Sequence, residues 1–293
     1  MNKKQYNSFL LVLLIAILGG GVAVLAKVGL KEMSPLSFTF WRFLSALAIL
    51  LPIFYIQKHR LSLDVFKKLF WVLLFAAGNI FIFIFGIRLT TASSSQVIYT
   101  FSPLIAGILS YFILGEKIGA KKIAGVILGL IGTLLIILLP VISGSSPING
   151  NVFGNLLILL AVFSHSIYTV LSKDKQKEFS PLVITTYSIL FTLLLSLVFL
   201  PLDAGSFLKM PSAGGILSIL YAGIAGTALF YLLYQYTIKN SSPLVASMVL
   251  YLEPIFTFIW ASVLLGEKIT IALIVGMIFV FLGVFLASTT KSK

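Results

Sequence analysis

The stretch that decides the fold runs from Ser93 to Gly132 and reads SSSQVIYTFSPLIAGILSYFILGEKIGAKKIAGVILGLIG. It predicts an apolar helix, a polar break at Gly115-Glu116-Lys117 and then a second apolar helix. The pattern returns 151 positions later, because Pro103 matches Pro254 and residues 114–118, LGEKI, match residues 265–269. A shared register over some forty residues of apolar sequence is hard to obtain by chance, so we interpret the chain as two copies of one unit.

The composition places most of the chain in a lipid bilayer. Of its 293 residues 59% are hydrophobic and only 10% are charged, and the mean hydropathy is +1.12. Soluble domains carry about 25% charged residues, so a water-soluble surface is excluded. The absence of cysteine excludes disulfides and thiolate metal sites. The net charge of +13 lies mainly in short loops, a topology signal, so we expect no nucleic-acid partner.

The apolar runs predict an all-α membrane protein with ten transmembrane helices. A span needs about 20 mostly apolar residues, and long continuous runs favour helices over barrel strands. The predicted spans are 9–26, 36–56, 69–87, 93–114, 123–139, 152–171, 182–202, 214–235, 244–265 and 269–287. The first run resembles a signal peptide, but residues 31–36, KEMSPL, match residues 177–182, KEFSPL. Because the first run thus has a counterpart in the second copy, we interpret it as a retained span.

The basic residues predict the orientation in the membrane. If the N-terminus is cytoplasmic, fifteen Lys and Arg lie in cytoplasmic segments and five lie in external loops, with Arg42 inside a span. This bias predicts a multi-pass protein of the cell membrane with both termini in the cytoplasm. Five helices is an odd number, so the second copy enters from the opposite side, as in inverted-topology transporters. The predicted units are residues 1–143, an external linker at 144–151, and residues 152–293.

These features together resemble EamA-type proteins of the drug/metabolite transporter superfamily. The resemblance is carried by the five-helix repeat, by the Pro-x10-Leu-Gly-Glu-Lys pattern of both halves, and by Trp41-Arg42-Phe43 early in the second helix. It covers essentially the whole chain and is more specific for fold than for substrate. It implies a central cavity lined mainly by helices other than the fifth and tenth. It also implies transport of amino acids, other metabolites or drugs, often outward.

The two proline positions indicate a polar site near the membrane midplane, once per repeat. Proline removes a backbone hydrogen bond and kinks a helix, and the carbonyls that it frees must meet protein, water or ligand. Ser102 and Glu253 precede Pro103 and Pro254 at equivalent positions, and the resemblance implies that both face the cavity. Glu253 is a carboxylate deep inside a span, which favours cargo or proton handling over a purely structural tie between helices.

The remaining substrate-binding candidates are polar or aromatic residues inside the spans. His165 and Arg42 are ionisable, with helix packing and snorkelling to the membrane surface as the alternatives. Trp41 and Tyr187 occupy equivalent repeat positions, which favours a shared central space. The full set of candidates is Trp41, Arg42, Asn79, Tyr99, Ser102, His165, Tyr168, Tyr187, Tyr231, Tyr251 and Glu253.

Glycines indicate close helix packing at two places. Gly125 and Gly129 form a small-xxx-small face on the fifth span, which we interpret as a seam between the two repeats. Gly19-Gly20-Gly21 on the first span would either loosen that helix or let another group approach its backbone.

These interpretations lead to a secondary transporter of small organic metabolites, with export of amino acids or related compounds as the favoured reading. The expected partners are a small-molecule substrate and the lipid bilayer, and proton coupling is an open alternative. No cofactor or metal is expected, and the oligomeric state stays open, a monomer being compatible with the sequence. The rival readings are a flippase for lipid-linked substrates, cationic drug efflux and, remotely, an intramembrane enzyme, which would need a paired acid and base.

Overall fold

The computed structural model of the chain describes residues 3–90, 92–142, 152–199, 201, 204–207, 211–265 and 271–289, and these are almost entirely helical. The first half contains α1 (Lys3–Gly29), α2 (Pro35–Ile56), α3 (Leu63–Ile87), α4 (Ala92–Tyr99), α5 (Ser102–Leu114) and α6 (Ala120–Ile142). The second half contains α7 (Val152–Lys175), α8 (Pro181–Phe199), α9 (Ala204–Phe207), α10 (Ala213–Gly223), the π-helical turn η2 (Ile224–Leu229), α11 (Phe230–Asn240), α12 (Pro243–Ser247), α13 (Val249–Leu265) and α14 (Ile271–Thr289).

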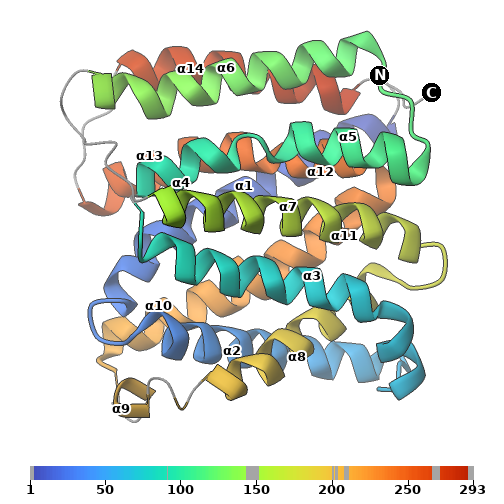
Figure 1. The fold of residues 1–293 in the computed structure, drawn as a ribbon, viewed down its shortest axis with the longest axis vertical. Coiled ribbons are helices and arrows are strands. Elements are labelled where there is room, and N and C mark those ends of the chain that lie inside the picture. Colours follow the sequence, from blue (N-terminus) through green and yellow to red (C-terminus); the bar gives the residue numbers. More distant parts are fainter. Residues whose placement is uncertain are drawn as a thin grey trace.

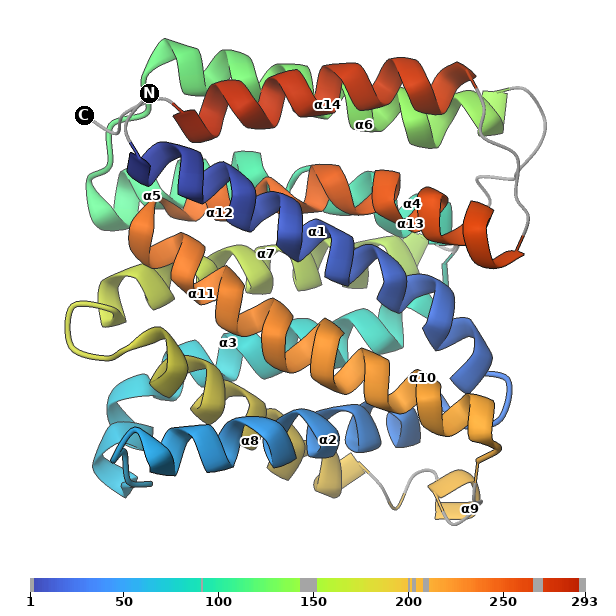
Figure 2. The ribbon, with the colours of Figure 1, turned by 180° about the vertical axis from the view of Figure 1, so that it is seen from behind.

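Ten long helical stretches fit the ten predicted spans. Eight of them are long and apolar enough to cross a membrane over their described residues, and Ile274–Thr289 is a shorter apolar helix. The helices run roughly alongside one another, and α1 begins and α14 ends at the same end of the bundle (Figures 1 and 2). We refer to this as the terminal end of the molecule and to the other as the opposite end.

Serine caps fix where several helices begin. The hydroxyl of Ser34 accepts from Ser37 N at 3.2 Å, and those of Ser180 and Ser242 each accept from the backbone three residues on. In all three places a proline follows the serine, and its fixed φ suits the first helical turn. The repeated KExSPL motif is therefore a helix start in both halves.

Two predicted spans are discontinuous, which corrects the expectation of continuous helices kinked at proline. The span 93–114 is broken at Thr100–Phe101, and Pro103 lies in the first turn of α5. The span 244–265 is broken at Met248, ahead of Pro254, which stays inside α13. The span 214–235 continues to Asn240 and contains the π-helical turn. The prolines thus indicated which two spans are irregular, but each break lies before the proline and not at it.

The repeated LGEK motif closes α5 with a glycine cap. Gly115 has a φ of 68°, a left-handed conformation that glycine adopts without steric cost. Its N–H bonds to the Tyr111 carbonyl at 3.1 Å, and Glu116 N bonds to the Ser110 carbonyl at 3.2 Å. The bond from Gly115 N–H to the Tyr111 carbonyl is that of an αL C-cap. The second copy of the motif lies outside the described residues.

A pair of helices, α6 and α14, lies along one edge of the bundle, and α2 and α8 lie at the other edge (Figures 1 and 2). The α6–α14 contact is a glycine seam, as predicted. A Cβ on Gly125 would lie 2.6 Å from the Gly283 carbonyl oxygen, and one on Gly132 would lie 2.7 Å from that of Gly276. Only glycine permits this approach.

Candidate functional site

The first helix is held tightly against α13 by its three adjacent glycines. A Cβ on Gly20 would lie 2.7 Å from the backbone of Phe256 and Thr257, and one on Gly19 would lie 2.8 Å from the Glu253 carboxylate. Trp260 Nε1 donates to the Ile17 carbonyl at 3.1 Å across the same contact. Because α1 is one unbroken helix, these glycines serve close packing, and they let the Glu253 carboxylate lie against the backbone of α1.

Four predicted residues come together at mid-span and form what we call the central polar group: Arg42, Tyr99, Tyr231 and Glu253. They come from α2, α4, α11 and α13, and both Tyr231 and Glu253 lie close enough to Arg42 and to Tyr99 to interact electrostatically. Each of the four side chains is partly exposed. No ion pair within 4 Å joins Arg42 or Glu253 to another described residue.

Arg42 is held by neutral groups of the π-helical turn. Its Nε donates to the Thr227 hydroxyl at 2.5 Å, and its Nη2 donates to the Gly226 carbonyl at 3.1 Å. The guanidinium carbon also lies 5.8 Å from the centre of the Phe43 ring, within cation–π range. The Arg42 side chain therefore points into the bundle and does not snorkel.

Tyr99 is positioned by Asn79. The Asn79 side-chain amide donates to the Tyr99 hydroxyl at 2.8 Å and to the Ala161 carbonyl of α7 at 2.9 Å. The buried amide thus has the partners that a polar group needs inside a membrane protein. These bonds tie α3 and α7 to the edge of the central polar group.

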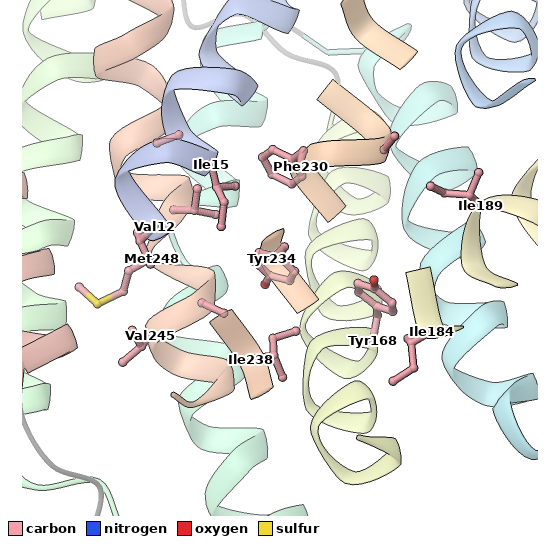
Figure 3. Packing of buried hydrophobic residues seen from close by; sticks show 14 of the residues in the cluster. Val12, Ile15, Tyr168, Ile184, Ile189, Phe230, Tyr234, Ile238, Val245 and Met248 are labelled. Carbon is pink, nitrogen blue, oxygen red and sulfur yellow. The ribbon is translucent and has the colours of Figure 1, made fainter. Parts of the chain in front are cut away.

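His165 and Tyr168 belong to a second polar set, between α7 and α11, which we call the α7–α11 seam. Tyr234 OH lies 3.2 Å from His165 Nε2 and 2.9 Å from the Thr169 hydroxyl. The Gln235 amide donates to the Tyr168 hydroxyl at 2.7 Å and to the Ser172 hydroxyl at 2.9 Å. Figure 3 shows Tyr168 on α7, and Phe230, Tyr234 and Ile238 on the neighbouring α11.

A lysine closes the seam at the terminal end of the molecule. Lys173 Nζ donates to the carbonyls of Ile238 at 2.8 Å and Ser241 at 2.9 Å. A cation at a helix C-terminus satisfies carbonyls that have no helical partner and complements the helix dipole. Tyr168 is 1% exposed, and Thr169, Ser172, Tyr234 and Gln235 are 0% exposed, so water does not enter along the seam in this state.

Four other predicted residues lie apart from the central polar group. Trp41 stacks on Phe207 of α9 with ring centres 5.4 Å apart. Tyr187 accepts from Ser62 N at 2.7 Å in the α2–α3 connection, so it lies away from Trp41. Ser102 lies 3.4 Å from the Ser166 hydroxyl, and Tyr251 is fully buried with its ring against Gly129 of α6. Roles in substrate binding for these four stay predictions.

Sequence reasoning missed Thr227 and Gln235. Gln235 is a neutral polar residue inside an apolar run, the same signal that singled out Asn79, and that rule would have found it. Thr227 had no such signal, because threonine in a helix can satisfy its hydroxyl with a backbone carbonyl.

Comparisons with known proteins agree about the family. A model of the EamA-like transporter family matches residues 7–138 and again residues 152–289. The chain is 28% identical to "Uncharacterized transporter YetK" of Bacillus subtilis, over 99% of this chain and 89% of that protein. It is 28% identical to "WAT1-related protein At3g02690, chloroplastic" of Arabidopsis thaliana, over 90% of this chain and 66% of that protein. A solved crystal structure superposes with a TM-score of 0.81 at 17% identity, covering 97% of both chains.

Proposed function

This chain belongs to the EamA-like transporter family, and from that premise we propose that it is a secondary transporter of amino acids or related small organic metabolites. It would move them across the cytoplasmic membrane by alternating access, with export as the favoured direction. The family and the Bacillus subtilis relative YetK are named as transporters, and the helices make the chain a multi-pass membrane protein. Substrate class, direction and mechanism are our proposal.

The central polar group is the observation that carries this proposal. A charged side chain at the middle of a span costs at least about 2.5 kcal/mol on insertion scales. Arg42 and Glu253 do not form an ion pair with each other, yet both are partly exposed at mid-span. Charges of both signs beside the rings of Tyr99 and Tyr231 complement a zwitterion with an apolar side chain.

Helix contacts support an inverted repeat. Within the proposed repeat α1 corresponds to α7, α5 to α13, and α6 to α14. The contact of α1 with α13 then maps onto that of α7 with α5, and both are extensive. In the α6–α14 seam, Gly125 contacts Gly283 and Gly132 contacts Gly276. In the repeat, Gly125 corresponds to Gly276 and Gly132 to Gly283, so the two contacts are equivalent. The two ranges matched by the family model fall on either side of the proposed linker.

The α7–α11 seam supports a transport cycle with one closed end. The seam, which reaches to the terminal end, is buried and its side chains are hydrogen-bonded to one another. The side chains of the central polar group are partly exposed. At the opposite end, the contact between Glu32 and Ser212 is exposed. We propose that this state is closed toward the cytoplasm and that opening of the seam exposes the central polar group to that side.

Reconstitution tests the proposed function. Purified protein in liposomes that contain no other protein should accumulate or release labelled L-amino acids, and empty liposomes should not. A parallel set with labelled lipid-linked sugars and cationic dyes tests the rival cargo classes. Movement of only one of those classes, with no amino acid moved, would replace the cargo that we propose.

A further inference from the structure

The π-helical turn places two acceptors on one edge of Arg42. Thr227 Oγ1 donates its single proton to the Ala222 carbonyl at 2.8 Å, five residues back. The hydroxyl can therefore only accept from Arg42 Nε, which is always a donor. The role of Thr227 in this contact is thus fixed by hydrogen-bond chemistry.

The second acceptor is a consequence of the π-helical geometry. In an α-helix the Phe230 N–H would bond to the Gly226 carbonyl, four residues back. Here it bonds to the carbonyls of Ala225 and Thr227. The Gly226 carbonyl is therefore turned to Arg42 Nη2 at 3.1 Å. Single π-helical turns occur frequently at functional sites, where they place such groups.

Two glycines let the turn lie this close to α1 and α2. A Cβ on Gly223 would lie 2.7 Å from the Arg42 carbonyl oxygen, and one on Gly226 would overlap the Val22 side chain. Larger residues at either position would push the turn away from the helix that carries Arg42. Gly223 and Gly226 therefore allow the turn to lie close enough to α2 for its hydrogen bonds with Arg42.

Two neutral acceptors hold the guanidinium without cancelling its charge. No carboxylate lies within 4 Å of Arg42 among the residues that the structure describes. Of the five N–H donors of an arginine, only those on Nε and Nη2 take part in the bonds to η2. The Nη1 edge, which makes no hydrogen bond to any described residue, keeps donors in a geometry that fits a carboxylate.

We propose that Thr227 is a positioning residue, and that it and the Gly226 carbonyl fix Arg42 so that its Nη1 edge binds the carboxylate of the cargo. This inference rests on the proposed function, because it assigns a substrate group to that site. It also makes a prediction that needs no cargo: the hydrogen bond from Nε to Thr227 restrains the guanidinium in the empty protein.

The first test observes the guanidinium directly. The chain has only three arginines, and Arg60 and Arg88 are exposed. Nuclear magnetic resonance of 15N-arginine-labelled protein should show one Nε–H that exchanges with water at least tenfold more slowly than the other two. Arg42→Lys assigns that signal. In Thr227→Val, which keeps the side-chain shape, the protection should be lost, and in Thr227→Ser it should return. Equal protection in wild type and Thr227→Val would overturn the proposal.

The second test measures recognition of the carboxylate. Each of the twenty L-amino acids is compared with its own carboxamide by thermal stabilisation of the purified full chain. The acid should bind at least tenfold more tightly than its amide in wild type and in Thr227→Ser, but within about twofold in Thr227→Val. Thr237→Val is the matched control on α11, since that hydroxyl bonds to the Leu233 carbonyl and to no other residue that the structure describes. The control should keep the preference.

The outcomes separate this inference from the proposed function. If the protein transports amino acids but shows no preference for them over their amides, the transport proposal stands and the role of Arg42 is overturned. Acid-selective binding without transport would support Arg42 and refute the transport proposal. A wild type that binds none of the acids more tightly than its amide also overturns the assignment of Arg42 to a carboxylate.

Discussion

The side-chain amide of Gln235 on α11 donates to the Tyr168 hydroxyl on α7 at 2.7 Å, in a part of the interior that water does not reach. The same amide accepts from Gln176 Nε2 at 2.6 Å. One glutamine thus joins the terminal ends of two helices, and its position on a buried seam leads to the first prediction.

Bridging the α7–α11 seam should stop transport. Because the chain has no native cysteine, Ser172→Cys and Gln235→Cys can be joined by a short bifunctional thiol reagent that is added during transport, when the proposed opening exposes both positions. If the seam must open once per cycle, the bridged protein should lose more than about tenfold of its transport rate in liposomes. Each single-cysteine variant, treated with the same reagent, shows how much of the loss comes from modification alone. Transport by the bridged protein at the unbridged rate would refute the gating role.

Replacing Glu253 with glutamine should change function and not folding. Glu253→Gln keeps the shape of the side chain but removes its charge, and a hydrogen bond to a charged group contributes about 1.5–3 kcal/mol. We expect cargo affinity to fall by about tenfold or more, or the pH dependence of transport to disappear, while membrane insertion and thermal stability stay the same. Glu178→Gln is the control, because that carboxylate is 55% exposed and lies 3.9 Å from Lys68. Unchanged affinity and an unchanged pH profile in Glu253→Gln would make the carboxylate structural.

The charge bias predicts which loops face the cytoplasm. Lys117 lies in the α5–α6 loop at the terminal end and Lys31 in the α1–α2 loop at the opposite end, and both are exposed. In intact cells a cysteine at position 31 should react with an impermeant thiol reagent, and one at position 117 should react only after permeabilisation. The reverse pattern would invert the orientation, and reaction of both in intact cells would contradict the topology. The counterpart loop at Lys268, which is also predicted to be external, lies outside the described residues.

Two loop carboxylates should change the stability of the fold with pH in opposite directions. Burial raises the pKa of Glu116 above its ordinary 4.5, against the opposing effect of Lys173 and Lys122. Hydrogen bonds from Ser212, which also caps α10, lower the pKa of Glu32. A raised pKa stabilises the fold at low pH and loses that contribution as pH rises from 4.5 through the folded value. A lowered pKa stabilises the fold above 4.5 and loses that contribution as pH falls through the folded value.

Thermal unfolding across pH measures both effects. Relative to wild type, Glu116→Gln should gain stability as pH rises above 4.5, and Glu32→Gln should lose stability as pH rises toward 4.5. Both differences should be small well below these ranges, where the wild-type carboxyls are protonated. Differences of the same sign in the two variants would show that burial does not dominate at Glu116.

The sequence by itself determined that the chain lies in a lipid bilayer, how many spans to expect, and that its two halves are copies of one unit. Composition alone requires a bilayer, and runs of about 20 apolar residues locate the helices because a span must satisfy its backbone internally. The helix starts at Ser34 and Ser180 and the glycine seam at Gly125 were also predictable, because caps and close contacts depend on residues next to each other in sequence or on one helix face. The candidate residues Arg42, Tyr99, Tyr231 and Glu253 were all named from their types and depth.

Only the tertiary structure decided which of these residues meet. Arg42 and Thr227 are 185 positions apart, and no local periodicity says which helix faces will lie together. The π-helical turn depends on packing against α1 and α2, and its carbonyl is freed by a register shift that residue propensities do not encode. For the same reason Trp41 and Tyr187, equivalent along the sequence, lie in different surroundings. In the inverted repeat that we propose, equivalent residues lie on opposite sides of the membrane, so only the packing of the two halves decides which of them share a site.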